Sequence, residues 1–278
     1  MKKNRMMRLA SGLLVAVLIT TSTISGTFAK YVTTDSASDS ARVAKWGVTV
    51  TATDDNDFFK ETYDGTVATS VSTEDLVAPG TRNDTGVTFA IAGKPEVDGR
   101  IVIAVNGLSL DKASTTVGVK DVVLKAGTYE NVTTGAADDE FVLNADYYPV
   151  KFTLTQTKAG VTTTLVPATP GASQTLAAVE AALENLSTPF EANDDLDAEL
   201  GTLKLTWAWD FGTAAVAAKD SNAWVLNIED ADKADTILGN LAAGKTVKKG
   251  AGLTGTVEAA DYNLETGFEI NVLVEQVD

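Results

Sequence analysis

The sequence predicts an all-β protein, a β-sandwich with one helical insertion. From residue 46 to the C-terminus, short segments alternate between apolar and polar side chains, and clusters of Gly, Pro, Asn and Asp separate them. Only one long helical pattern interrupts these segments. With 278 residues, 44% of them hydrophobic, the chain can bury a substantial core. Many strands with one helix favour a sandwich over an α/β fold.

Residues 1–29 have the three parts of a secretory signal peptide. A basic segment, Met1–Arg8, precedes an apolar run that starts at Leu9, and small residues follow. Thr27 and Ala29 occupy positions −3 and −1 of a cleavage site before Lys30. An uncleaved anchor is the alternative, but the apolar run is shorter than the ~20 residues that span a bilayer. We therefore expect cleavage after Ala29 and a secreted protein in the extracellular matrix or at the cell surface.

Residues 30–43 form a polar arm of small side chains with no helical or strand periodicity, so alone it would be flexible. The arm leads into the domain of residues 44–278 and its first predicted strand, the half-buried Trp46–Thr53. An extended arm can pair with an open sheet edge of a neighbouring subunit through main-chain hydrogen bonds. Its tip is therefore a candidate donor strand, and a linker without a partner is the alternative. The candidate residues are Lys30, Tyr31, Val32, Thr33 and Thr34.

The oxygen-rich turn Asp54–Asp57 closes the first strand. Such a turn could hold Ca²⁺, but it lacks the distal bidentate Glu of a complete calcium loop. A solvated turn is the favoured interpretation, and no metal site or cofactor is predicted.

Four strands and the helix are expected next. Arg100–Val105 is apolar on both faces and should therefore lie centrally in a sheet. The helix carries Leu at 176, 183 and 186 and Val at 179, and Pro189 should stop it. It would cap one end or face of the sheet. The other three strands are Val87–Ile91, Val117–Leu124 and Tyr147–Gln156.

The strongest strand pattern is Gly201–Phe211. Trp207, Trp209 and Phe211 share a face with two leucines, so we expect them in the core. An exposed aromatic platform for carbohydrate is the alternative. A short helical turn, Ala231–Leu238, should then end at Gly239, and the chain finishes on an alternating strand, Gly267–Val277.

Composition excludes several functions. Removing residues 1–29 removes four basic residues and leaves 18 basic against 38 acidic residues, a net charge of −20. That balance argues against nucleic acid, and against a membrane after cleavage, because phosphate binding needs clustered Lys and Arg. The chain has no Cys and no His, so it has no thiolate nucleophile, Ser-His-Asp triad or His zinc pair. No catalytic residues are predicted and no enzyme is expected, although a hydrolase with two carboxylates is a rival.

Several segments together resemble TasA/camelysin-type secreted proteins. They are Gly26-Thr-Phe-Ala-Lys-Tyr31, the Ser/Asp-rich arm, Ala44-Lys-Trp-Gly-Val48 and Ala78-Pro-Gly80. Trp207-Ala-Trp209 followed by Ala234–Gly239 resembles a C-terminal pattern of clostridial members. The resemblance implies export through a SipW-type signal peptidase, a jelly-roll sandwich and a subunit of a biofilm matrix fibre built by N-terminal strand donation. Camelysin is described as a surface metalloprotease, but a chain without His lacks the usual zinc ligands.

The expected function is therefore that of a secreted structural subunit of an extracellular fibre or biofilm matrix. Its expected partners are further copies of itself and, during export, a signal peptidase. A monomeric cell-surface adhesin or carbohydrate-binding module is the alternative, and it requires exposed aromatic side chains in a groove.

Overall fold

The structure, a computed structural model, describes residues 45–52, 58–59, 75–106, 120–132, 139–210, 215–219 and 222–277. The predicted signal peptide, the arm, the turn Asp54–Asp57 and Phe211 lie outside these residues. The chain divides into two compact units, Met1–Trp46 and Gly47–Asp278, and every helix and strand named below belongs to the second. No helix among the described residues is long and apolar enough to cross a membrane.

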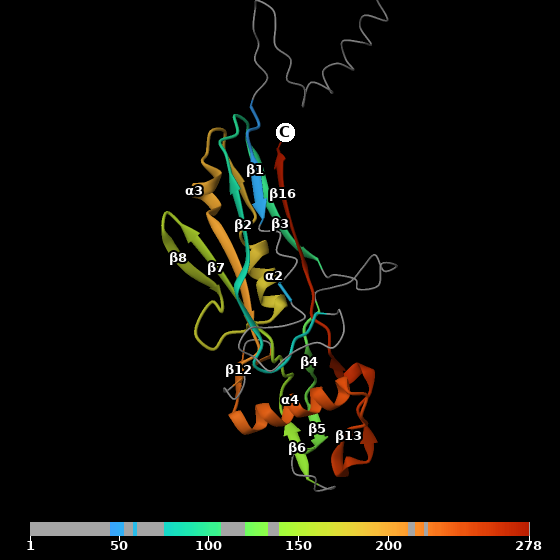
Figure 1. The fold of residues 1–278 in the computed structure, drawn as a ribbon. Coiled ribbons are helices and arrows are strands. Elements are labelled where there is room, and N and C mark those ends of the chain that lie inside the picture. Colours follow the sequence, from blue (N-terminus) through green and yellow to red (C-terminus); the bar gives the residue numbers. More distant parts are fainter. Residues whose placement is uncertain are drawn as a thin grey trace, which may run out of the picture. The chain divides into compact units, whose positions relative to one another are not determined.

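Two antiparallel sheets carry the longer strands of the Gly47–Asp278 unit (Figure 1). The first has the order β1-β2-β10-β7-β8 and the second has the order β16-β3-β9. The strands of the first sheet are β1 (Thr49–Ala52), β2 (Arg82–Ala92), β10 (Thr202–Ala208), β7 (Lys151–Lys158) and β8 (Val161–Val166). Those of the second are β16 (Glu269–Gln276), β3 (Gly99–Asn106) and β9 (Thr188–Phe190).

Three smaller sheets complete the fold, with the orders β14-β13-β5-β6, β15-β4 and β11-β12. Their strands are β4 (Val123–Leu124), β5 (Gly127–Glu130), β6 (Glu140–Leu143), β11 (Ala215–Lys219), β12 (Asn222–Leu226), β13 (Lys248–Lys249), β14 (Gly255–Thr256) and β15 (Tyr262–Asn263). The all-β class predicted from the sequence is confirmed. The jelly-roll order of strands stays a prediction.

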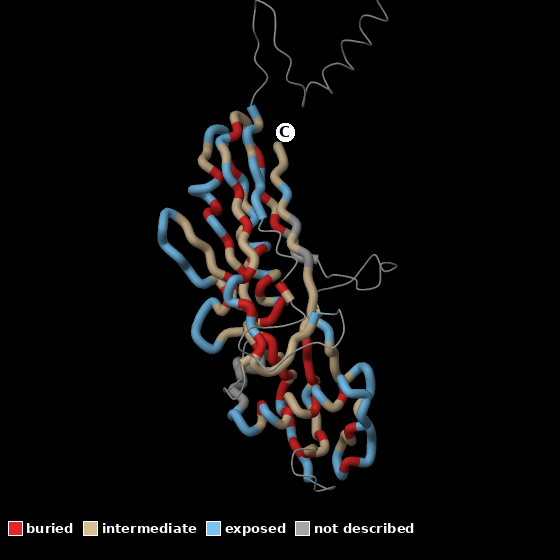
Figure 2. The backbone as a smooth tube through the Cα atoms, in the orientation of Figure 1, coloured by how far each residue is buried: buried red, intermediate tan, exposed pale blue. Residues whose placement is uncertain are grey.

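The core lies where the inward side chains of β10, β7 and β3 meet (Figure 2). Trp207, Phe152 and Ile103 are each at most 1% exposed. The predicted central position of β3 is confirmed, because β16 and β9 flank it. The predicted strand over Val117–Leu124 starts outside the described residues. From Lys120 on, β4 contains only Val123 and Leu124, and Lys120 makes a single bridge to Gly267.

The expectation of a single long helix is wrong. The structure has three helices among its described residues: α2 (Leu176–Glu184), α3 (Leu196–Leu200) and α4 (Ile228–Ala242). The turn expected over Ala231–Leu238 belongs to α4, the longest helix, and Gly239 does not end it. Asn227 caps the start of α4 by accepting a hydrogen bond from the backbone N–H of Asp230. Gly239 is exposed on the solvent side of this helix. The helix continues beyond Gly239 because Leu238 and Leu241 are buried on its other side.

Candidate functional site

An apolar groove lies between β1 and β16, the strands at one edge of each large sheet. Its volume is about 250 Å³. All but one of its lining side chains are apolar, and they come from three strands: Val50 and Ala52 of β1, Val87, Thr88 and Phe89 of β2, and Ile270 and Val272 of β16, with Phe268 just before β16. Within the described residues, β1 is hydrogen-bonded only to β2, and β16 only to β3. The groove is therefore flanked by two strands that each have one side without a partner among the described strands.

The inward-facing side chains of β1 are exposed, and no described segment covers them. Val50 of β1 lies opposite the fully buried Ile91 of β2, so both point toward the inside of the sandwich. Val50 is nevertheless 44% exposed, and all four residues of β1 are exposed. The predicted half-buried strand at Trp46–Thr53 is confirmed at Trp46 and Val48, which are half-buried. It is wrong at Val50 and Ala52, because nothing among the described residues covers their inner face.

The opposite side of the sandwich is closed. There α2 packs against β3, β7 and β8, and its Leu176, Val179 and Leu183 are fully buried. A remote carboxylate holds this helix in place: both oxygens of Asp121 lie 3.1 Å from the backbone N–H of Leu176, at the start of α2. The helix that was expected to cap a face of the sheet therefore fills the gap at one side of the sandwich.

Phe268 connects the groove to an aromatic cluster in the core. Its ring centroid lies 5.2 Å from that of Phe58 and 6.3 Å from that of Phe152, with the rings nearly perpendicular. The indole N–H of Trp207 donates a 2.7 Å hydrogen bond to the carbonyl oxygen of Phe58, and the Asn83 amide donates to the same oxygen at 3.0 Å. The aromatic cluster therefore packs beneath Phe268 and forms the bottom of the groove.

The entry to β1 depends on a glycine. Gly93 has a φ of +128°, and a Cβ on it would lie 2.1 Å from the carbonyl oxygen of Gly47. Only glycine adopts this φ without strain and leaves room for the close approach. The short strand β1 can therefore lie against the end of β2, where it forms one wall of the groove.

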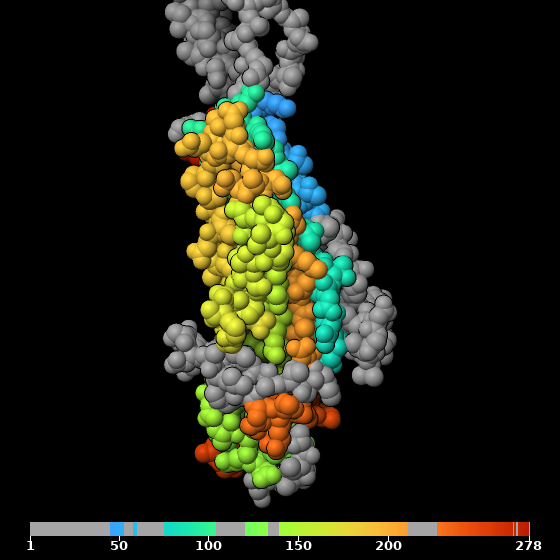
Figure 3. Space-filling view, turned by 90° about the vertical axis from the view of Figure 1, so that its left-hand side faces the viewer, coloured from blue at the N-terminus to red at the C-terminus, as the bar shows by residue number. Residues whose placement is uncertain are grey.

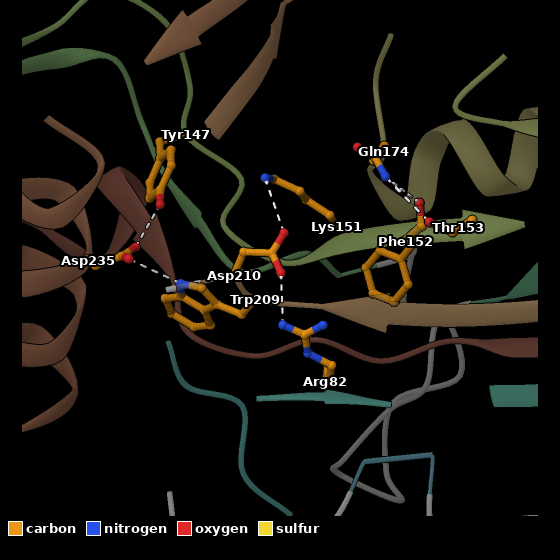
Figure 4. Close-up of polar contacts among 9 residues, drawn as sticks. All are labelled: Arg82, Tyr147, Lys151, Phe152, Thr153, Gln174, Trp209, Asp210 and Asp235. Atoms are coloured by element: carbon orange, nitrogen blue, oxygen red, sulfur yellow. Dashed lines mark hydrogen bonds and ion pairs between the residues drawn. The ribbon is translucent and has the colours of Figure 1, made fainter. Parts of the chain in front are cut away.

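A polar cluster lies at the end of β10 (Figure 4). Asp235 of α4 accepts hydrogen bonds from the hydroxyl of Tyr147 at 2.7 Å and from the indole N–H of Trp209 at 3.2 Å. Burial raises the pKa of Asp235 to about 6. Nearby, Asp210 forms ion pairs with Arg82 at 3.5 Å and with Lys151 at 3.7 Å.

This polar cluster is a structural connection. Both carboxylate oxygens of Asp235 are engaged by neutral donors, so the hydrogen bonds join α4 to the end of β10 and to the segment before β7. No group of three or more acidic side chains that could hold a metal ion occurs in the described part of the chain.

The structure places the candidate site residues predicted from the sequence in different environments. Trp207 and Trp209 are 1% and 5% exposed, so neither indole offers a face to a sugar. The cleavage site, Ala29 and Lys30, and the donor-strand residues lie outside the described residues. The groove was not predicted from the sequence. The alternation of Val50 and Ala52, and of Ile270 and Val272, was a usable signal for inward faces, but it does not tell which strands stand at sheet edges.

No family model matches this chain, and no similar protein was found among curated proteins or solved structures.

Proposed function

We propose that this protein is a secreted structural subunit of an extracellular fibre or biofilm matrix, assembled by donation of the N-terminal arm of one copy to the next. The observation that carries the proposal is the apolar groove, which has on either side a strand edge that no other described strand pairs with. A strand laid into it would gain main-chain hydrogen bonds from an edge and apolar contacts from the groove. Because donor and acceptor sites differ, the contact is heterologous and propagates into a filament.

The arm has the length that this role requires. Residues 30–43 reach roughly 46 Å when extended, at about 3.3 Å per residue. The eight residues of β16 span about 26 Å by the same measure. The arm can therefore pair along the whole of β16 and still leave residues to join two subunits. Tyr31 and Val32 point to opposite faces of an extended arm, so one of them enters the groove.

Two features of the sequence suit the arm to this groove. Ser, Thr and Ala make up half of residues 30–43, and small side chains let the backbone of the arm approach a strand edge. Before cleavage the arm is continuous with the signal peptide, so removal of residues 1–29 would free its tip at the time of export. The rival function, a carbohydrate-binding module, is not favoured, since both predicted platform indoles are buried.

Electron microscopy of the purified secreted protein tests the proposal. The mature protein should form filaments, and a variant without Lys30–Arg42 should form none while it keeps an unchanged melting temperature. Val50→Arg should also abolish filaments, because it places a charge in the groove at an exposed position. The matched control is Val142→Arg on β6, where the side chain is 53% exposed and lies outside the groove.

Cross-linking then identifies the acceptor edge. The chain has no cysteine, so every disulfide is an engineered one. A Thr33→Cys copy mixed with a Leu273→Cys copy should give a heterodimeric disulfide, whereas a mixture with Val142→Cys should not. Filaments that persist after both the arm deletion and Val50→Arg would contradict strand donation.

A further inference from the structure

The strand β8 ends the larger sheet on the side away from the groove, and it is exposed. Within the described residues it pairs only with β7, and its first four residues are exposed (pale blue at the left of Figure 2). Val161 is 66% exposed, the highest value among the large hydrophobic side chains described as exposed. In Figure 3 the yellow-green β7–β8 hairpin lies at the surface, beside the orange β10 and the teal β2.

This edge has only one of the features that normally keep strand edges apart, a bulge at Leu165, where the register between β7 and β8 shifts. Natural edge strands carry charges or Pro, or they are covered. From Val161 to Val166 the sequence is Val-Thr-Thr-Thr-Leu-Val, with no charge and no Pro. The wider segment 147–179 contains no Asp or Glu, although the chain has 38 of them. Two copies of this strongly acidic protein can therefore approach each other here without repulsion between carboxylates.

The β7–β8 turn determines which backbone groups of β8 are unpaired. The turn residues Ala159 and Gly160 have φ values of +48° and +79°, as in a two-residue type I′ hairpin. In such a hairpin the flanking residues, Lys158 and Val161, form a hydrogen-bonded pair, and pairs along the ladder then alternate. The N–H and C=O groups of Thr162 and Thr164 consequently point away from β7. The Oγ atoms of Thr157 and Thr162 are 2.9 Å apart, which fits a close pair without backbone hydrogen bonds.

We propose that β8 is a self-association edge that pairs antiparallel with β8 of a second copy, about a two-fold axis at Thr163. In this register Thr162 of each copy lies opposite Thr164 of the other, and their outward N–H and C=O groups form reciprocal hydrogen bonds. Val161 then lies opposite Leu165, the bulged residue that has no partner on β7, and the contact covers this most exposed valine. Registers with the axis at Thr162 or Thr164 place part of the pairing beyond an end of the strand. The contact is isologous and closes as a pair, and it does not depend on strand donation.

Single cysteines test the register, because the natural chain has none. Thr163→Cys places two thiols on the two-fold axis, in a pair whose Cα atoms lie about 4.5 Å apart, within the range of a disulfide. Thr162→Cys is the matched control, since two such thiols are diagonal neighbours about 7–8 Å apart. Disulfide-linked dimers should form at least about tenfold faster for Thr163→Cys, as expected for an intermolecular pair held in place. Equal rates for the two variants would overturn the register.

Oppositely charged substitutions at Thr163 test whether two copies associate through β8. Thr163→Lys and Thr163→Glu each place like charges opposite one another. In the protein without Lys30–Arg42, each variant alone should therefore sediment as a monomer, whereas the same protein with Thr163 forms dimers. An equimolar mixture should recover the dimer. Deletion of Lys30–Arg42 should leave this dimer intact while it removes filaments, so the two contacts can fail separately. A parent protein that stays monomeric after the arm deletion, or a mixture that does not recover dimers, would contradict the proposal.

Discussion

The hydroxyl of Tyr147 donates a 2.7 Å hydrogen bond to the carboxylate of Asp235, 88 residues further along the chain. The second carboxylate oxygen accepts from the indole of Trp209. Burial raises the pKa of Asp235 to about 6, and the negative charge of Asp232 adds to this, while the two hydrogen bonds and the positive charge of Lys151 oppose it. A buried carboxylate with neutral partners makes the stability of this junction depend on pH.

Asp235→Asn should reduce the pH dependence of stability. The pKa of Asp235 is higher in the folded protein than the ordinary value of 3.8. The stabilising effect of its protonation is therefore complete below about pH 4 and is lost as the pH rises through about 6. Asp235 should account for a loss of up to about 3 kcal/mol of the parent's free energy of unfolding over that range, and the variant should lack this loss. Urea denaturation at a series of pH values measures the difference.

Asp232→Asn is the matched control, because it removes one charge from the exposed side of the same helix. It should keep most of the parent's pH dependence. Burial also raises the pKa of Asp121 to about 6. The pH dependence of stability that Asp121 contributes should therefore remain in both variants. Parallel stability curves for the parent and Asp235→Asn would contradict a buried, ionising Asp235.

Trp207→Ala should be among the most destabilising single substitutions in this chain. The side chain is 1% exposed and donates a hydrogen bond to the carbonyl oxygen of Phe58. Removing it leaves a large cavity, and the expected loss is about 3–5 kcal/mol. Trp207→Phe should cost less, since it fills most of the space and removes only the hydrogen bond. Chemical denaturation monitored by far-UV circular dichroism gives both values, and a Trp207→Ala variant that melts like the parent would place the indole outside the core.

Gly201→Ala should destabilise the protein more than Gly171→Ala does. Both glycines have positive φ values, +69° and +82°. A Cβ at position 201 would lie 2.2 Å from the carbonyl oxygen of Thr157, whereas nothing lies within 4 Å of a Cβ at position 171. Gly171→Ala therefore measures the cost of a positive φ in open space, roughly 1–2 kcal/mol. The further loss in Gly201→Ala combines the clash with β7 and the ψ of −153° at Gly201, which essentially only glycine adopts. Equal melting temperatures would mean that the start of β10 shifts to make room.

The mature protein should begin at Lys30. The basic segment, the apolar run and the small residues before Ala29 motivate this expectation. N-terminal sequencing of protein recovered from culture supernatant or the cell surface is the direct measurement. A secreted form that still starts at Met1 would contradict cleavage, and it would also leave the arm without a free end.

Local patterns determined much of this fold. Alternating side chains located β7, β10 and β16, because a period of two residues arises within a single strand and needs no knowledge of its neighbours. A continuous apolar run located β3. The apolar spacing from Leu176 to Leu183 located α2 for the same kind of reason. Strand ends were less well predicted: the Gly201–Phe211 segment contains β10 only as far as Ala208, although the chain stays buried through Trp209.

Only the tertiary structure decided what each element packs against. The pattern at Val50 and Ala52 indicates an inward face, but whether that face is covered depends on strands far away in the sequence. Local sequence patterns could not identify Asp235 for the same reason, because its hydrogen-bond partners Tyr147 and Trp209 are distant in the sequence and come together with it only on folding. Hydrogen bonding between strands and burial between sheets are long-range interactions, so the two open edges β1 and β16, the groove between them and the exposed edge of β8 could be identified only once the chain was folded.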